Sequence, residues 1–144
     1  MLLDMCVFSD AQSIVGSAVV LSTNIVDTEV AGSNLGGGTP VWLVVRVNTA
    51  FAQTTSAVTS IAFVNLLHGL ASGTVTQTLL SGQMITVATT ASLTANLGKG
   101  ADLLTVPLPI DNLRYLRIQF QPTGGSGFSA GNIDAFLTTA APRN

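Results

Sequence analysis

Two stretches of the chain alternate between apolar and less apolar positions with a period of two, and both predict β-strands. In residues 41–47 the odd positions are all aliphatic, while Trp42 and Arg46 fall on the other face with Val44. In residues 114–121 three apolar residues point the same way: Leu116, Ile118 and Phe120. Because successive side chains of a strand point to opposite faces, each stretch predicts one buried and one outward face.

Shorter segments rich in Val, Ile and Thr predict further strands. These segments are 18–26, 57–64, 74–80, 83–89, 103–108 and 132–138. Ser81 and Gly82 suit a tight hairpin between two of them. Pro107 and Pro109 favour an extended segment that is not a central strand. A helical turn is an alternative at 66–70 or 91–97.

The punctuation of these strands by Gly and Pro, with few good helix formers, predicts the fold class. We expect an all-β, jelly-roll-like sandwich of two sheets and about eight strands. The length of 144 residues fits one domain. We predict a single sandwich domain over 14–144 and an N-terminal arm over 1–13.

The first 13 residues are too apolar for a free tail, because they include Leu2, Leu3, Met5, Val7 and Phe8. Chain ends are usually disordered unless they are tied down. The arm is therefore expected to dock, either on the chain's own sheet or on a neighbouring subunit.

Charge is the unusual feature of the composition: Asp, Glu, Lys and Arg make up 8% of the residues, against roughly 25% in ordinary soluble domains. None of these four residue types occurs from Val47 to Gly98. One interpretation is a neutral, polar, threonine-rich surface. The other is that neighbouring subunits cover much of this stretch, since the cores of interfaces are depleted in charge.

Several classes of partner are disfavoured. With five Lys and Arg residues and a net charge of −2, the chain lacks the basic surface that nucleic acids require. Its longest apolar runs are about five residues, whereas a membrane-spanning helix needs about 20. The start carries Asp4 and no basic region, so it does not read as a signal peptide. We expect synthesis in a cytoplasm, which agrees with the single cysteine, Cys6.

Candidate chemistry is sparse, and the chain is not expected to be an enzyme. His68 is the one histidine, and no carboxylate lies between Glu29 and Asp102 in the sequence. A catalytic histidine needs an orienting carboxylate and a nucleophile nearby, so a loop or interface histidine is the better interpretation. The pair Asp27 and Glu29 lacks the further oxygen ligands of a calcium site. No catalytic residue, metal site or cofactor is predicted.

The order of the motifs resembles a known family, the capsid cement (decoration) proteins of short-tailed bacteriophages, of the Bordetella-phage type. The resemblance lies in the first 50 residues and from about Leu103 onward, roughly two-thirds of the chain; residues 48–100 match only in strand character. The motifs that carry it are FSDAQ at 8–12, STNIVD at 22–27, GTPVWLVVRV at 38–47 and LRYLRI at 113–118.

The resemblance implies a jelly-roll subunit on the outer face of an icosahedral virion head, bound where major capsid protein subunits meet. It also implies a homodimer or homotrimer. The alternative is a carbohydrate-binding jelly-roll module for surface attachment, with Trp42 or Tyr115 lining a shallow groove.

Six residues are the candidates for an interface. Trp, Tyr and Arg are the usual anchors of protein interfaces, and the strand pattern turns four such side chains outward: Trp42, Arg46, Tyr115 and Arg117. Leu3 and Phe8 of the predicted arm are the next candidates.

Overall fold

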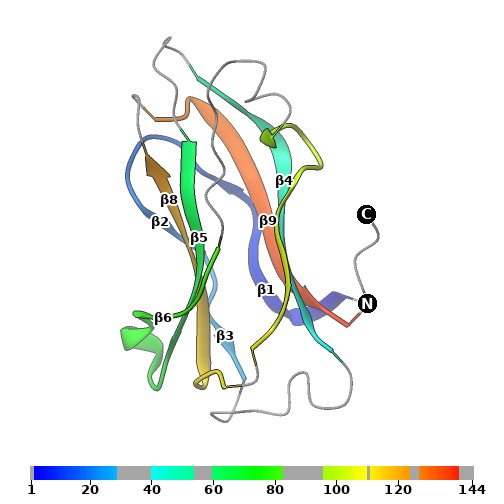
Figure 1. Cartoon of the computed structure of the whole chain (residues 1–144), viewed down its shortest axis with the longest axis vertical. Coiled ribbons are helices and arrows are strands. Elements are labelled where there is room, and N and C mark those ends of the chain that lie inside the picture. Colours follow the sequence, from blue (N-terminus) through cyan, green and yellow to red (C-terminus); the bar gives the residue numbers. More distant parts are fainter. Residues whose placement is uncertain are drawn as a thin grey trace.

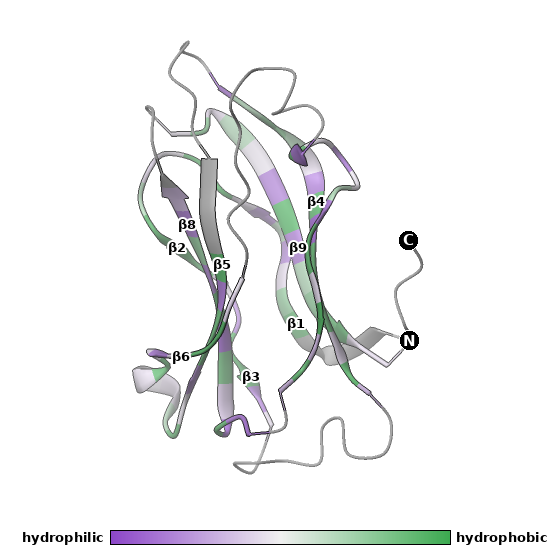
Figure 2. Cartoon of the chain, in the orientation of Figure 1, coloured by the Kyte–Doolittle hydropathy of each residue, from purple (hydrophilic) through white to green (hydrophobic). Residues whose placement is uncertain are grey.

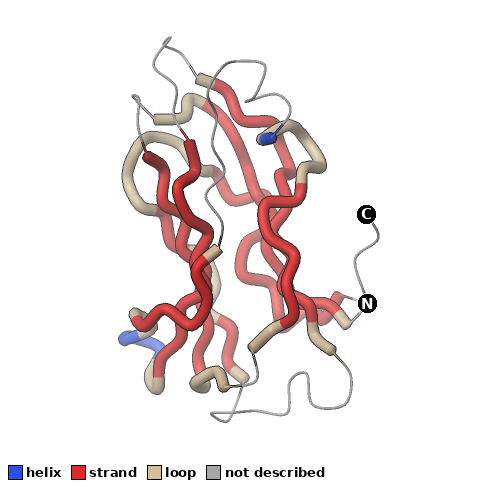
Figure 3. The backbone as a smooth tube through the Cα atoms, viewed as in Figure 1, coloured by secondary structure: helices blue, strands red, loops and turns tan. Residues whose placement is uncertain are grey.

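The computed structural model is a sandwich of two antiparallel sheets (Figure 1). The structure describes residues 2–28, 40–53, 60–82, 96–109, 111–123 and 127–139. One sheet has the strand order β1-β9-β4-β7, and the other has the order β2-β8-β5-β6, with β3 also paired to β8. Strands and loops make up almost all of the described chain (Figure 3). The predicted all-β, jelly-roll-like, two-sheet fold is confirmed.

Nine strands and one short 3-10 helix, η1, are present in the described residues. The first sheet consists of β1 (Leu2–Ser13), β9 (Ala130–Thr138), β4 (Trp42–Ala52) and β7 (Asp102–Pro107). The second consists of β2 (Val20–Leu21), β3 (Val26–Asp27), β8 (Tyr115–Thr123), β5 (Ser60–Gly69) and β6 (Gln77–Ser81), with η1 (Ser72–Thr74) between β5 and β6.

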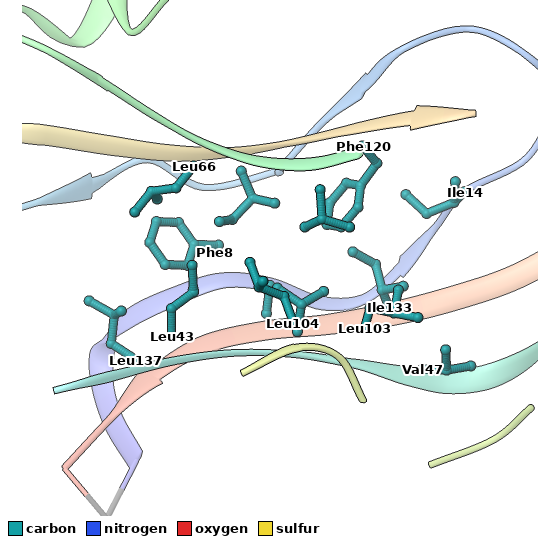
Figure 4. Packing of buried hydrophobic residues seen from close by; sticks show 14 of the residues in the cluster. Phe8, Ile14, Leu43, Val47, Leu66, Leu103, Leu104, Phe120, Ile133 and Leu137 are labelled. Carbon is teal, nitrogen blue, oxygen red and sulfur yellow. The ribbon is translucent and has the colours of Figure 1, made fainter. Parts of the chain in front are cut away.

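The period-two patterns form the core as predicted. The alternation of hydropathy along β9 is visible in Figure 2. Inward residues of the two sheets meet between the layers (Figure 4), and the following are fully buried: Leu43, Val45, Leu116, Ile118, Phe120, Ile133, Ala135 and Leu137. Burial of a Val, Leu, Ile or Phe side chain contributes about 1.5–3 kcal/mol relative to exposure, so these facing rows hold the two sheets together.

The predicted strand at 18–26 is wrong as a single element, because it breaks into β2 and β3 at Ser22. The backbone N–H of Ile118 donates to Ser22 Oγ at 3.1 Å, and Ser22 Oγ donates to the Asn24 carbonyl at 2.9 Å. Serine side chains compete with the backbone for hydrogen bonds in this way. The ladder to β8 is therefore interrupted between the two short strands.

The predicted helical turn at 66–70 is also wrong, because β5 continues to Gly69. Leu66 and Leu67 pair with β8 on one side and β6 on the other, and both are buried. An apolar run of this kind suits a strand that is covered on both faces. The predicted strand at 83–89 lies outside the described residues, as does most of the alternative turn at 91–97. As expected from its prolines, β7 is an edge strand of the described sheet.

The N-terminal residues join the chain's own sheet, which is one of the two docking sites left open by the sequence. Strand β1 pairs with β9, with register shifts between Leu2 and Val7, Val7 and Ser9, and Ser9 and Gln12. On its other side Asn24 donates its backbone N–H to the Phe8 carbonyl at 2.9 Å. Whether this segment also works as an arm on a neighbour stays a prediction.

Gln12 clamps β1 to the segment that leads into β3. Its amide Nε2 donates to the Leu21 carbonyl at 2.8 Å, and its Oε1 accepts from the Thr23 N–H at 3.0 Å. Ser9 Oγ also donates to Gln12 Oε1, at 2.5 Å. One side chain thus satisfies backbone groups that would otherwise be open at the edge of the sandwich.

The substitution Gln12→Ala should lower the free energy of unfolding by about 1–2 kcal/mol, because each net hydrogen bond contributes about 1 kcal/mol. Urea titration followed by circular dichroism measures this change. Gln77→Ala is the matched control, since Gln77 is an exposed residue of the edge strand β6. Equal stability of the two variants would contradict the clamp.

Candidate functional site

Trp42 and Arg46 lie on the outer face of the first sheet, as the strand pattern predicted. Arg46 is opposite Asp134 of β9 and Asp102 of β7, and antiparallel partners share a face. Arg46 Nε donates to Asp102 Oδ1 at 2.6 Å. This hydrogen bond raises the pKa of Arg46; the charges of Asp102 and Asp134 add to the increase, and partial burial opposes it. The guanidinium is thus oriented before any partner binds.

The centre of this outer face is apolar. Val44 is flanked in register by Phe136 and Thr105, and Phe136 by Val7. Val44 is only 1% exposed although it points away from the core between the sheets, and Phe136, Val7 and Trp42 are half-buried. The face therefore has a buried centre with the ion pair of Arg46 beside it.

Tyr115 and Arg117 lie on the outer face of the second sheet. The Arg114 guanidinium sits 5.0 Å from the centroid of the Tyr115 ring and forms two hydrogen bonds to Asp27, at 2.7 and 2.8 Å. A cation over an aromatic ring is attracted by the negative charge of the ring face. One face of Tyr115 is thus covered within the chain.

Arg117 differs from Arg46 in its partners. Its Nε donates to the Ser22 carbonyl at 3.2 Å, and within the described residues it forms no ion pair with a carboxylate. The guanidinium charge is held in place by a neutral acceptor and is not neutralised there. Of the four outward candidates, Arg117 is the cation most available to an acidic partner group.

Next to Arg117 the same face carries an uncharged ladder of side chains. Asn65 Nδ2 donates to Gln119 Oε1 at 3.0 Å, and Ser81 Oγ donates to Asn65 Oδ1 at 3.2 Å. The ladder links β8, β5 and β6 across the outer face. The ladder is polar and carries no ionic charge, in agreement with the low content of charged residues in the chain.

The six candidate residues do not form one patch. Trp42 and Arg46 lie on one broad face of the sandwich, and Tyr115 and Arg117 lie on the opposite one. Phe8 corrects the prediction: it is fully buried and packs near Leu43 and Leu66 in the core (Figure 4), so its side chain is taken up by the sandwich itself. Leu3 belongs to β1, but its side chain lies outside the described residues.

His68 has a structural contact and lies in a strand, not in a loop. It belongs to β5, and its Nδ1 accepts the backbone N–H of Leu113 at 3.2 Å. This bond ties β5 to the turn that precedes β8. Among the described residues no three His, Cys, Asp or Glu side chains gather as a metal site would require. Asp27 contacts Arg114, while Glu29 and the side chain of Cys6 lie outside the described residues.

A pocket of about 400 Å³ lies between the edge strands β6 and β7. Its walls are mostly aliphatic: Leu80, Ser81, Gly82, Leu103, Leu104, Thr105 and Val106. Thr105 Oγ1 is buried without a hydrogen-bond partner in the described structure, on the outer-face side of β7 where Thr105 is opposite Val44. Neither Trp42 nor Tyr115 lines this pocket, so it does not provide the aromatic groove of the carbohydrate-binding alternative.

A comparison with protein families decides where the chain belongs. The Bbp16 family model matches residues 8–137, from within β1 to within β9. The chain belongs to the Bbp16 family. The family name agrees with the Bordetella-phage part of the resemblance seen in the sequence. A search of curated proteins finds no match to the chain.

The Bbp16 match reaches every strand of both sheets and includes all four outward candidates, whereas Leu3 precedes it. The described part of this Bbp16 chain contains no helix that is long and apolar enough to cross a membrane. Sequence reasoning missed Gln12 and the exposed aliphatic residues between β1 and β2. The absence of any Asp, Glu, Lys or Arg from residue 11 to residue 26 was the available signal for the second group.

Proposed function

We propose that the chain is a structural cement protein. It binds the outer surface of an icosahedral phage head, at junctions between major capsid protein subunits, and stabilises the head. It acts as a homodimer or homotrimer and is made in the host cytoplasm. It uses no cofactor and binds neither nucleic acid nor membrane.

The observation that carries this proposal is the pair of outward faces. Trp42 and Arg46 on one side and Arg117 on the other are large side chains typical of interface anchors, and the chain that presents them has unusually few charged residues, 8% in all. A monomer in solution relies on mixed surface charge for solubility. Faces of this kind on both sides of one sandwich support contacts with more than one neighbour. Membership of the Bbp16 family supports the phage context.

The proposed role requires no catalytic step, and we infer that the chain is not an enzyme. His68 is engaged with a backbone N–H, and the carboxylates of Asp27 and Asp102 are engaged with arginines. A rigid sandwich that contacts several shell subunits holds them at fixed separation. Each contact is modest, but many linked copies act at high effective concentration, and about 1,000 Å² of buried surface per contact is enough for specific binding.

The test uses phage heads assembled without this protein. We expect such heads to break at lower temperature than complete heads, and the purified protein to restore their stability when it is added back. Light scattering during heating measures both effects. Heads that bind the protein without any gain in stability, or a location in the tail, would contradict the proposal.

Single substitutions then test which faces of the sandwich bind the heads. Trp42→Ala and Arg117→Ala should each weaken binding to the heads about tenfold or more, which corresponds to at least about 1.4 kcal/mol. Gln77→Ala on the exposed edge strand β6 is the control and should bind as the unaltered protein does. Co-sedimentation of protein with heads gives the apparent affinities.

A further inference from the structure

Residues 14–21 cross from one sheet of the sandwich to the other. At the start, the Ile14 N–H donates to the Gly131 carbonyl at 2.9 Å, and Gly16 forms an isolated bridge with Phe128 beside the first sheet. At the end, β2 pairs with β8 of the second sheet. Strands that change sheets in this way form corners of sandwiches, so this segment runs along the side of the molecule.

The crossing segment exposes aliphatic side chains where polar ones are expected. Ile14 is fully buried, but Val15 is 53% exposed, Val19 is 49% exposed and Leu21 is 38% exposed. The outward positions of a strand that faces water are normally polar. We name Val15, Val19 and Leu21 the crossover ridge. Val15 lies near the first sheet, and Leu21 lies in β2 of the second, so the three exposed side chains follow the crossing segment from one sheet to the other.

The surroundings of the crossover ridge limit the chemistry of a partner. Residues 11–26 contain no ionisable side chain, so a charged group placed over Val15 or Val19 would lose its hydration without gaining a counter-charge from this segment. Opposite the ridge we therefore expect an uncharged, apolar patch.

A cation lies at the border of the ridge. Leu21 is opposite Gln119 on β8, and Arg117 is two residues further along the same face of that strand. Arg117 is held there by the Ser22 carbonyl at 3.2 Å. An apolar centre with a polar rim is the usual anatomy of a protein interface, and an acceptor or carboxylate on the partner suits the rim.

Addition of a partner strand to the edge is disfavoured at this place. The Leu21 carbonyl and the Thr23 N–H are already bonded to the Gln12 amide. Recognition by strand addition relies on free backbone groups of this kind. These two backbone groups are not open to a partner strand, and we place the contact on the side chains.

The ridge is too small to hold two proteins together by itself. The exposed fractions of its three side chains amount to roughly 200 Å², whereas a stable interface buries about 800 Å² on each partner. A second copy in free solution would gain too little from it. A subunit that is already bound to the shell by other contacts gains affinity from the ridge, because the additional contact then forms within one complex.

We propose that the crossover ridge docks on an uncharged apolar patch of the shell protein, with Arg117 at the rim of the contact. This inference rests on the proposed function and names one surface by which the chain binds the shell. The ridge is an auxiliary contact that acts together with the broad faces.

The test compares three proteins on heads assembled without this chain: the unaltered protein, the triple variant Val15→Ser, Val19→Ser and Leu21→Ser, and the control Leu70→Ser. Leu70 is 69% exposed and lies outside the ridge. We expect the triple variant to bind at least about tenfold more weakly and the control to bind normally. Thermal unfolding checks that all three are folded, and Val19→Thr, which keeps the branched shape, replaces the triple variant if that one is unstable.

The outcomes separate the two proposals. If the unaltered protein binds the heads and the ridge variant binds equally well, the ridge assignment is wrong and the proposed function stands. If the unaltered protein does not bind, both are wrong. If the ridge variant changes an oligomer into a monomer in light-scattering measurements, the ridge belongs to contacts between copies, and its assignment to the shell is overturned.

Discussion

Replacing Phe8 by alanine should lower the free energy of unfolding by about 3–5 kcal/mol. Phe8 is fully buried and packs between the two sheets, so the truncation removes apolar burial and leaves a cavity that close-packed neighbours cannot fill. A domain of this kind is stable by about 5–15 kcal/mol in total. The midpoint of thermal unfolding should fall by about 10–20 °C, as measured by calorimetry.

The neighbouring substitution Val7→Ala is the control for Phe8→Ala. Val7 is half-buried on the outer face of β1, so its truncation should cost about 1 kcal/mol. If Phe8→Ala left stability unchanged but abolished binding to heads, Phe8 would belong to an interface, as the sequence suggested, and the packing in Figure 4 would not describe the protein in solution.

Regular alternation explains why much of the fold could be predicted from the sequence. In β4, β8 and β9 one face is buried against the opposite sheet, and selection for that face leaves a period of two in the sequence. The same pattern correctly turned Trp42, Arg46, Tyr115 and Arg117 outward. In these three strands local periodicity is sufficient to predict the strand and the orientation of its side chains.

The assignment of strands to sheets depends on pairing between distant residues, which no local pattern contains. Trp42 and Tyr115 both point outward, but β4 belongs to one sheet and β8 to the other. The two side chains are therefore on opposite sides of the molecule. The sequence grouped Trp42 and Tyr115 as candidates for an interface, but the sheet topology places them on two separate faces.

Irregular hydrogen bonding accounts for two wrong predictions, the exposed position of Phe8 and the single strand at 18–26. In β1 three register shifts disturb the alternation, so the burial of Phe8 could not be derived from its position in an apolar stretch. At Ser22 a side-chain hydroxyl replaces a backbone acceptor. Each departure depends on a tertiary partner, Ile118 or β9, that lies far away in the sequence.

Replacing Gly127 by alanine should have the second large effect, a loss of about 3 kcal/mol or more of stability. Its φ is +91°, and an added Cβ would lie 2.2 Å from the carbonyl carbon of Gly16 and 2.6 Å from the N of Ser17. These are backbone atoms, so relief requires the start of the crossing segment to move away from Phe128. The bridge between Gly16 and Phe128, with N···O distances of 2.8 and 3.2 Å, should open as a result.

Substitutions at two other glycines separate the two contributions to this loss of stability, the positive φ and the steric clash. Gly100 has a φ of +85° but nothing within 4 Å of an added Cβ, so Gly100→Ala should cost only the conformational term of about 1–2 kcal/mol. Gly73 has free space and no positive φ, and Gly73→Ala should be neutral or stabilising by up to about 1 kcal/mol. Chemical denaturation of the three variants measures the series. A cost at Gly127 equal to that at Gly100 would mean that the close approach to Gly16 is absent, and with it the support that positions the crossover ridge.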